Sequence, residues 1–324
     1  NTDKNLRNQV IYSIYVRNHT QEGTFRAVIP DLDRIKTLGV DIIWFLPIHP
    51  IGVKGKKGTL GCPYANRDYR SVNPEYGTMD DFKELVDAIH ARNMKCIIDV
   101  VYNHTFSRDT SFQALAPYYY YRQNEDGSMS DGSACGNETA SNHLMVRKFM
   151  IDSLKYWVEE YHIDGFRFDL MGLHDVETMN EIRKALNQLP NGDEILMYGE
   201  PWRGAESPMI HDTMPALKAN VEYLNEGIAI FNDDTRDVIK GSVFYKEKPG
   251  FVNGKSGLEE EIASSVLSWY QRSDAYKPKG PGQIISYVSA HDNWTLWDKL
   301  NYTLREKPDF LEKNDEILQM NKFA

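Results

Sequence analysis

The segment Gly165-Phe-Arg-Phe-Asp169 decides the fold, because a short apolar run ends there in a guanidinium and a carboxylate. Three further segments have the same form: Asp99-Val-Val-Tyr-Asn-His104, Tyr198-Gly-Glu200 and Val288-Ser-Ala-His-Asp-Asn293. A strand of a parallel barrel has this pattern, since its apolar residues are buried and its C-terminal end opens onto the rim. The four segments therefore predict parallel strands whose polar ends share one rim.

Short apolar runs alternate with amphipathic stretches along the whole chain, which indicates strands joined by helices. The predicted strands are residues 10–16, 42–46, 96–101, 165–168, 196–198, 227–231 and 284–288, and the predicted helices are residues 29–38, 79–92, 144–160, 176–189 and 258–269. Thr78 and Asp175 are predicted N-caps. The fold class that follows is α/β, in the form of a (β/α)8 TIM barrel.

Residues 103–142 interrupt this alternation. They are too many for a simple βα connection and are rich in Ser, Asn, Asp and Gly, so they predict an inserted subdomain after the third strand. The first part of the barrel is then residues 1–102, and residues 143–324 are the remainder. No eighth strand is recognisable after Asp298, so we expect a chain truncated before strand 8 and its helix.

The bulk composition excludes several classes of partner. The chain has 324 residues and a net charge of −10, which argues against a nucleic acid or an anionic membrane as partner. Cys62, Cys96 and Cys135 form no C-x-x-C pair, so neither a disulfide framework nor a zinc site is indicated. No apolar run approaches the roughly 20 residues of a membrane helix. We expect a soluble protein, cytoplasmic or secreted, of unspecified oligomeric state.

The polar start, Asn1 to Asn8, lacks Met and indicates a trimmed N-terminus, with no signal peptide visible.

The predicted strand ends carry three carboxylates, Asp169, Glu200 and Asp292. Several acids on one rim suit the cleavage of a glycosidic bond, in which one acid protonates the leaving oxygen and another carboxylate meets the developing positive charge. A lone acid at a strand end is more often a cap or an ion-pair partner. Arg167 lies two residues before Asp169, on the same face of the strand, so we expect it to keep Asp169 ionised.

Glu200 lies between two aromatic residues, Tyr198 and Trp202. An apolar wall of this kind raises the pKa of a carboxyl group, so that it can donate a proton. The sequence therefore predicts a division of roles between a nucleophilic Asp169 and a proton-donating Glu200.

In this order the four segments resemble the four signature regions of the α-amylase superfamily of retaining glycoside hydrolases, family 13. The resemblance implies that Asp169 is the nucleophile, Glu200 the general acid/base and Asp292 the transition-state stabiliser. The other residues that it implies at the substrate site are Tyr64, Asp99, His104, Arg167, Trp202 and His291. It further implies an α-glucan as substrate and, in an intact protein, a small C-terminal β-domain that is absent from this chain.

The resemblance implies no required cofactor and leaves calcium open. Asn103 matches a position at which many α-amylases supply a calcium ligand, but calcium takes six to eight oxygens. The residues after Asp169, Leu-Met-Gly-Leu-His174, depart from the Ala-x-Lys-His pattern that helps to complete that site in amylases. Asn103 is therefore a calcium candidate without a recognisable ligand set.

The two halves of the chain resemble different subfamilies. Tyr198-Gly-Glu-Pro-Trp202 and His291-Asp-Asn-Trp-Thr-Leu-Trp-Asp298 are similar to type I pullulanases, which cut α-1,6 links, whereas Gly58-Thr-Leu-Gly-Cys-Pro-Tyr-Ala-Asn-Arg-Asp-Tyr69 is similar to α-1,4 amylases. The residues after Glu200 and the insertion shape the acceptor side, so we favour debranching. An α-1,4 endo-amylase, a dual enzyme, a transglycosylase and a non-catalytic carbohydrate-binding barrel are the alternatives.

Overall fold

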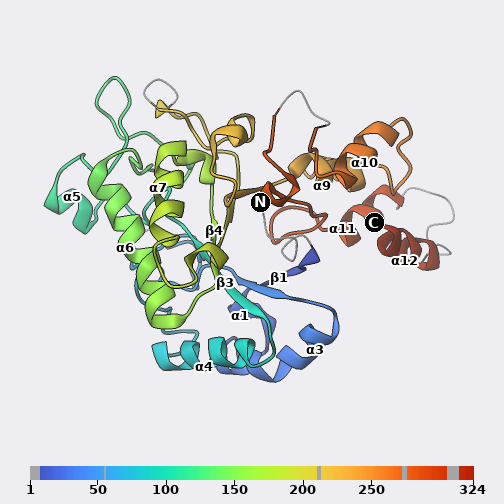
Figure 1. The fold of residues 1–324 in the computed structure, drawn as a ribbon, viewed down its shortest axis with the longest axis horizontal. Helices are drawn as coiled ribbons and strands as arrows, with labels where there is room; N and C mark the ends of the chain where they lie inside the picture. The colour runs from blue at the N-terminus through green and yellow to red at the C-terminus, as the bar shows by residue number, and fades with distance from the viewer. Residues whose placement is uncertain (1–7, 55, 210–212, 272–275, 305–313) are drawn as a thin grey trace. The chain divides into compact units, whose positions relative to one another are not determined.

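A computed structural model describes residues 8–54, 56–209, 213–271, 276–304 and 314–324 (Figure 1). The chain divides into two compact units, Asn1–Ala229 and Ile230–Ala324. Residues 1–7, where the sequence predicts a trimmed start, lie outside the described residues.

Parallel strands form the centre of the first unit. They are β1 (Ile11–Ile14), β2 (Ile42–Phe45), β3 (Lys95–Val100), β4 (Gly165–Phe168) and β5 (Leu196–Gly199), each paired in parallel with the next. Every residue of β2 and β4 is buried. Strands covered on both faces are expected to be continuously apolar, which explains why these short runs were recognisable in the sequence.

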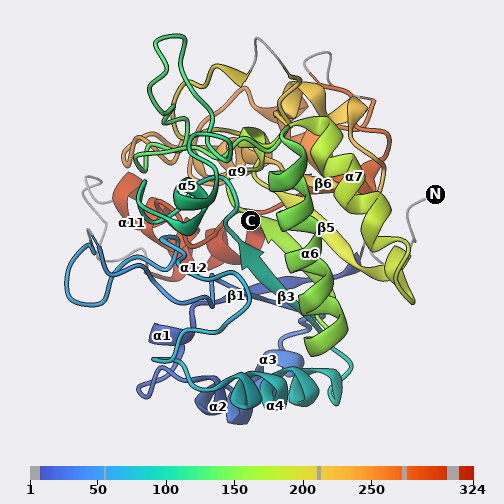
Figure 2. The same cartoon turned by 90° about the vertical axis from the view of Figure 1, so that its left-hand side faces the viewer.

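Helices alternate with these strands. They are α1 (Val16–His19), α2 (Phe25–Val28), α3 (Leu32–Thr37), α4 (Met79–His90), α5 (Ser111–Leu115), α6 (Leu144–Tyr161) and α7 (Val176–Leu186). Figure 2 shows α6 and α7 side by side, and residues of the two helices are in contact. Thr78 caps α4 in a capping box with Asp81, and Asp175 accepts a hydrogen bond from the Thr178 backbone amide at the start of α7. Both predicted N-caps are confirmed.

The second unit contains four α-helices and two short parallel strands among its described residues. They are β6 (Ala229–Phe231, whose first residue ends the first unit), α9 (Asp233–Lys240), α10 (Glu259–Val266), β7 (Ile284–Ile285), α11 (Leu296–Leu304) and α12 (Asn314–Phe323). Leu296, Leu300 and Leu304 of α11 pack with Ile317 of α12 in a small core. Helices α9 and α11 were not predicted from the sequence.

The strand order is β1 to β7, the same as the order along the chain, so the predicted α/β class with parallel strands is confirmed. The described residues contain no eighth strand. Each predicted strand is found, but β7 covers Ile284–Ile285 instead of residues 284–288. The predicted insertion at residues 103–142 contains α5 and isolated antiparallel bridges, such as that between Tyr121 and Thr139. Its domain boundaries stay a prediction.

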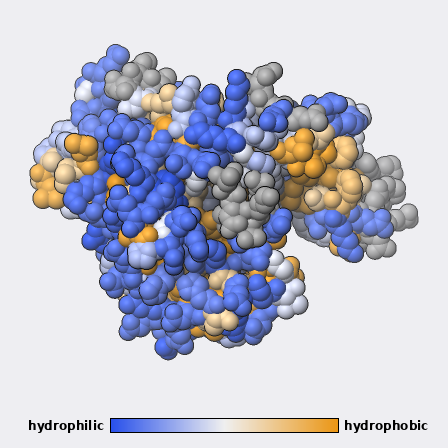
Figure 3. Space-filling view, in the orientation of Figure 1, coloured by the Kyte–Doolittle hydropathy of each residue, from blue (hydrophilic) through white to orange (hydrophobic). Residues whose placement is uncertain are grey.

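The surface is mostly hydrophilic in the view of Figure 3, with an apolar area over α5, where Leu115 is 76% exposed. Of the helices that the structure describes, none has the length and apolar character needed to cross a membrane.

His174 makes the stability of the first unit dependent on pH. Its ring is fully buried, neither ring nitrogen has a hydrogen-bond partner among the described residues, and burial lowers its pKa from 6.5 to about 4. The unfolded chain therefore binds a proton here before the folded one does, so this contribution to stability is complete above pH 6.5 and is lost as the pH falls towards 4.

Acidification should lower the free energy of unfolding less in His174→Phe than in the wild type, by up to about 3 kcal/mol. This follows because a difference of one pKa unit corresponds to about 1.4 kcal/mol. Urea unfolding at pH 7 and pH 4.5 measures it: the loss of unfolding free energy between the two should be smaller in the variant. Equal losses in both proteins would contradict this assignment.

Candidate active site

The parallel register places two of the predicted site residues side by side and a third, Glu200, close to them. Asp99 of β3 is paired with Arg167 of β4, and Arg167 is paired with Tyr198 of β5, two residues before Glu200. Because side chains alternate along a strand, Arg167 and Asp169 point to the same face. Neighbouring strand ends thus bring together groups that are distant in the sequence.

The Arg167 guanidinium contacts three carboxylates. Its Nη1 donates to Asp99 Oδ1 at 3.0 Å and to Asp169 Oδ1 at 3.1 Å, and its Nη2 donates to Glu200 Oε1. The guanidinium carbon also lies 5.1 Å from the ring centroid of Trp44, within the range of a cation–π contact. Arg167 is therefore the centre of the site, and it is 1% exposed.

Burial and charge act in opposite directions on this cluster. Burial lowers the pKa of Arg167, but Asp99 and Glu200 outweigh it and hold that pKa well above its usual value. Burial raises the pKa of Asp99 well above its usual range, although Arg167 opposes this shift. Arg167 thus stays charged, and its charge balances acids that the fold has removed from water.

Asp169 is held from a second side by Asn103. The Asn103 Nδ2 donates to Asp169 Oδ2 at 2.8 Å and to the Asp169 carbonyl oxygen at 2.9 Å. Asn103 Oδ1 in turn lies 2.7 Å from His104 Nδ1. Burial lowers the pKa of His104, so its ring is neutral around pH 7. The predicted nucleophile is therefore fixed by one cation and one amide.

Glu200 is fixed by an unusual backbone conformation. Its Oε2 accepts a hydrogen bond of 2.9 Å from the Leu170 amide, while its Oε1 accepts from Arg167. Leu170 has a φ of 41° and a ψ of 52°, a left-handed conformation that is unfavourable for a residue with a branched side chain. Strain of this kind is typical of functional sites.

Tyr64 joins the cluster through its hydroxyl, which donates to Asp99 Oδ2 at 2.9 Å. Trp202 is half-buried, and its carbonyl oxygen lies 2.6 Å from the position that a Cβ would occupy at Gly172. A side chain at Gly172 would therefore displace the segment that follows Glu200.

Asp292 and His291 lie in the second unit. Asp292 Oδ2 is 3.5 Å from His291 Nε2, and the Asp292 side chain is 60% exposed. The buried Lys240 of α9 donates to the Trp294 carbonyl oxygen at 2.6 Å and so anchors the segment just after Asp292. The first unit thus brings together seven of the predicted residues, namely Tyr64, Asp99, Asn103, His104, Arg167, Asp169 and Glu200, and the second holds His291 and Asp292 by itself.

The surroundings of Asn103 do not fit the calcium site considered from the sequence. Its amide nitrogen is used by Asp169, and its amide oxygen faces His104. No group of three His, Cys, Asp or Glu side chains suited to a metal is found in the part of the chain that the structure describes. The amide of Asn103 orients Asp169.

Sequence reasoning missed two members of the site. The Leu170 backbone amide left no signal, because a left-handed Leu cannot be recognised from composition. Trp44 lay in a predicted strand, but only the tertiary structure shows that its ring faces Arg167.

Residues 8–127 match the family described as alpha amylase, catalytic domain. The pullulanase of Bacillus subtilis (strain 168) is 36% identical over 316 residues, which cover 92% of this chain and 43% of that protein. Pullulanase A of Streptococcus pneumoniae is 31% identical over 349 residues, which cover 97% of this chain and 26% of that protein.

A crystal structure of the pullulanase from Paenibacillus barengoltzii in complex with maltohexaose and α-cyclodextrin superposes with a TM-score of 0.85 and 34% identity, covering 97% of this chain and 53% of that one. The chain therefore spans about half or less of the length of these relatives. Together with the cluster around Arg167, these matches show that the chain belongs to the α-amylase superfamily, family 13 of the glycoside hydrolases, with pullulanases among its relatives.

Proposed function

We propose that this chain forms the barrel of a retaining glycoside hydrolase that acts on α-glucans, with a preference for α-1,6 branch links. The observation that carries the proposal is the placement of Asp169 and Glu200 on the single guanidinium of Arg167. The relatives support it, since the chain is 36% identical to a pullulanase over 92% of its length.

Glu200 gives its proton to the glycosidic oxygen while Asp169 attacks the anomeric carbon, so the C–O bond to the leaving sugar breaks and a covalent glycosyl ester forms. Glu200 then takes a proton from water, which attacks the same carbon and releases Asp169. This course requires carboxyl groups about 5–5.5 Å apart. Arg167 holds the nucleophile in place through a hydrogen bond, and Asp292 stabilises the transition state.

The remaining residues would bind sugar. His104 is neutral and uses Nδ1 for Asn103, so its Nε2 would contact a sugar hydroxyl. Tyr64 and Trp202 would stack on sugar rings, and His291 would hydrogen-bond the sugar at the cleaved position. No step requires a cofactor, and the net charge of −10 suits a neutral glucan better than a nucleic acid.

A second candidate is α-1,4 hydrolysis, alone or combined with debranching. The match of residues 8–127 to the α-amylase catalytic domain favours it. A non-catalytic carbohydrate-binding barrel would be expected to have lost one of Asp169, Glu200 and Asp292, and all of them are present.

The products formed from pullulan, amylose and amylopectin distinguish these functions. A debranching enzyme should release maltotriose from pullulan, because cutting each α-1,6 link leaves trisaccharide units. Panose from pullulan, or rapid shortening of amylose with pullulan untouched, would show that the linkage assignment is wrong. Binding of maltohexaose without any product would favour the non-catalytic barrel.

A further inference from the structure

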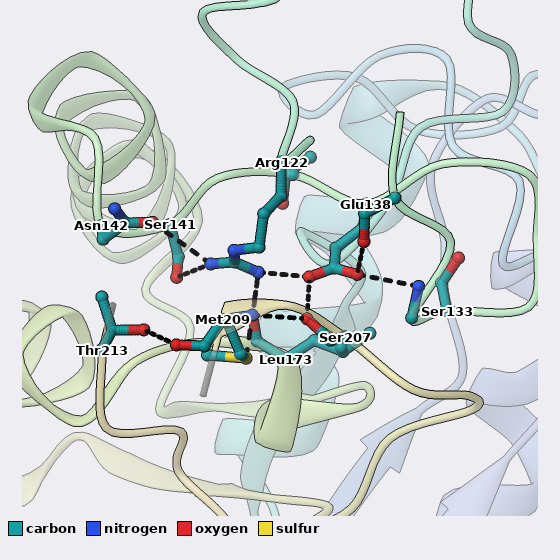
Figure 4. Close-up of polar contacts among 12 residues, drawn as sticks. Arg122, Ser133, Glu138, Ser141, Asn142, Leu173, Ser207, Met209 and Thr213 are labelled. Atoms are coloured by element: carbon teal, nitrogen blue, oxygen red, sulfur yellow. Dashed lines mark hydrogen bonds and ion pairs between the residues drawn. The ribbon is translucent and has the colours of Figure 1, made fainter. Parts of the chain in front are cut away.

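A buried ion pair joins the predicted insertion to segments that follow β4 and β5 (Figure 4). Arg122 Nη1 donates to Glu138 Oε1, and Glu138 is fully buried. Arg122 also donates to the carbonyl oxygen of Leu173, after β4, at 3.3 Å. Ser207, after β5, donates through its hydroxyl to the same Glu138 oxygen.

The other Glu138 oxygen serves the insertion itself. Glu138 Oε2 accepts from Ser130 Oγ at 2.6 Å and from the Gly132 amide at 2.8 Å. The carboxylate thus accepts four hydrogen bonds, about as many as its lone pairs allow. Ser207 provides one of the four, and it is the one that comes from the segment after Glu200.

The insertion and the segment after Trp202 are packed closely against each other. A Cβ at Gly132 would lie 2.4 Å from Glu138 Oε2, and one at Gly204 would lie 2.5 Å from the Ser133 carbonyl oxygen. The Ala205 amide donates to the Gly132 carbonyl oxygen at 2.7 Å. The segment after Trp202 therefore packs directly on the insertion. The Ala205 amide and the Ser207 hydroxyl both donate hydrogen bonds to it.

The residues beside Glu138 contact the segment that carries His104. The Asn137 side chain accepts from the Thr105 amide at 2.9 Å and donates to the Thr105 carbonyl oxygen at 2.8 Å, next to His104. The Thr139 amide donates to the Asn103 carbonyl oxygen at 3.0 Å. One short stretch of the insertion thus contacts both the segment that carries His104 and the segment that follows Glu200.

We propose that Glu138, through Ser207, is a positioning residue for the acceptor side of the site, where it sets the place of the segment from Trp202 to Ser207 relative to Glu200. This inference rests on the proposed function, because an acceptor side exists only if a glucan is cleaved. It assigns to a residue outside the four signature segments a role in binding the leaving sugar.

Two serine substitutions separate this role from a general loss of packing. Ser207→Ala removes the hydroxyl that fastens the acceptor-side segment, and Ser130→Ala removes a buried hydroxyl that donates to the same carboxylate from within the insertion. Both leave Arg122 and Glu138 in place. The KM and kcat of each variant are measured on pullulan, which has acceptor-side sugars, and on maltosyl fluoride, which has none.

Ser207→Ala loses the hydrogen bond to Glu138 and the acceptor of the Met209 amide. We expect it to raise the KM for pullulan about fivefold, an effect of the size that the loss of a hydrogen bond usually has, with unchanged kinetics on maltosyl fluoride. Ser130→Ala should match the wild type on both substrates. Equal effects of the two variants on pullulan, or an equal loss on both substrates in Ser207→Ala, would overturn the proposal.

Hydrogen exchange of the amides in residues 203–207, in the absence of substrate, gives a second readout that needs no activity. Met209 is left out because its amide donates to Ser207 Oγ itself. We expect faster exchange in Ser207→Ala and wild-type exchange in Ser130→Ala. If the wild type cleaves neither substrate, the proposed function is wrong, and hydrogen exchange is then the test of the positioning role. The same exchange rates in both variants would refute that role.

Discussion

Asp169→Asn is expected to lower kcat on α-glucans by on the order of 10⁴-fold or more, because an amide cannot form the covalent glycosyl ester. Substrate binding should change by no more than about twofold, since the substitution removes little contact area and retains an oxygen that can accept from Arg167. Release of reducing ends measures turnover, and calorimetry with maltohexaose measures the dissociation constant.

Glu200→Gln is the matched comparison, because it also replaces one carboxylate of the cluster by an amide. It should be severely impaired on pullulan, whose leaving group needs a proton, but much less impaired in forming the covalent intermediate from maltosyl fluoride, whose fluoride leaves without one. An Asp169→Asn variant that still turns over pullulan, or a Glu200→Gln variant with most of its activity on pullulan, would contradict the assigned roles.

Arg167→Met should destabilise the first unit by about 3–5 kcal/mol, the usual effect of removing one partner of a buried ion pair. The methionine would leave the buried carboxylates of Asp99 and Glu200 without their shared cation. Burial already raises the pKa of Asp99, and its protonation would relieve part of the penalty, so the loss should be smaller at pH 5 than at pH 8. Urea unfolding at both pH values measures it.

Arg26→Met is the control for this experiment. The Arg26 side chain is 67% exposed and pairs with Asp81 and Glu84 at the surface, where an ion pair contributes at most about 1 kcal/mol. If the two variants lost equal stability, the Arg167 cluster would not be the buried centre described above. Activity adds a second distinction, since only Arg167→Met should lose turnover.

The sequence alone determined the features that depend on near neighbours in the chain. The strands were recognisable because residues such as those of β2 are buried throughout, and the caps Thr78 and Asp175 because an N-cap acts within one helical turn. The pairing of Arg167 with Asp169 also followed from local geometry, since residues two apart in a strand share a face.

Helices α9 and α11 were not predicted, although each has a local cap: Asn232 precedes α9, and Thr295 and Asp298 form a capping box at the start of α11. Helix α9 begins Asp233-Asp-Thr-Arg, a polar run, and is defined by the cap that Asn232 provides. Helix α11 buries Leu296, Leu300 and Leu304 against α12, and their spacing of four residues is that of one apolar helix face. Their stability comes from tertiary packing more than from propensity.

Only the tertiary structure decided how the site is held together. Arg167 reaches Asp99 and Glu200 because the strand register aligns β3, β4 and β5, and Glu200 is fixed by the amide of a left-handed Leu170. Hydrogen bonds of a few ångströms between residues tens of positions apart depend on the path of the chain, which no local pattern encodes. The strand ends could therefore be identified from the sequence, whereas the contacts that orient their acids could not.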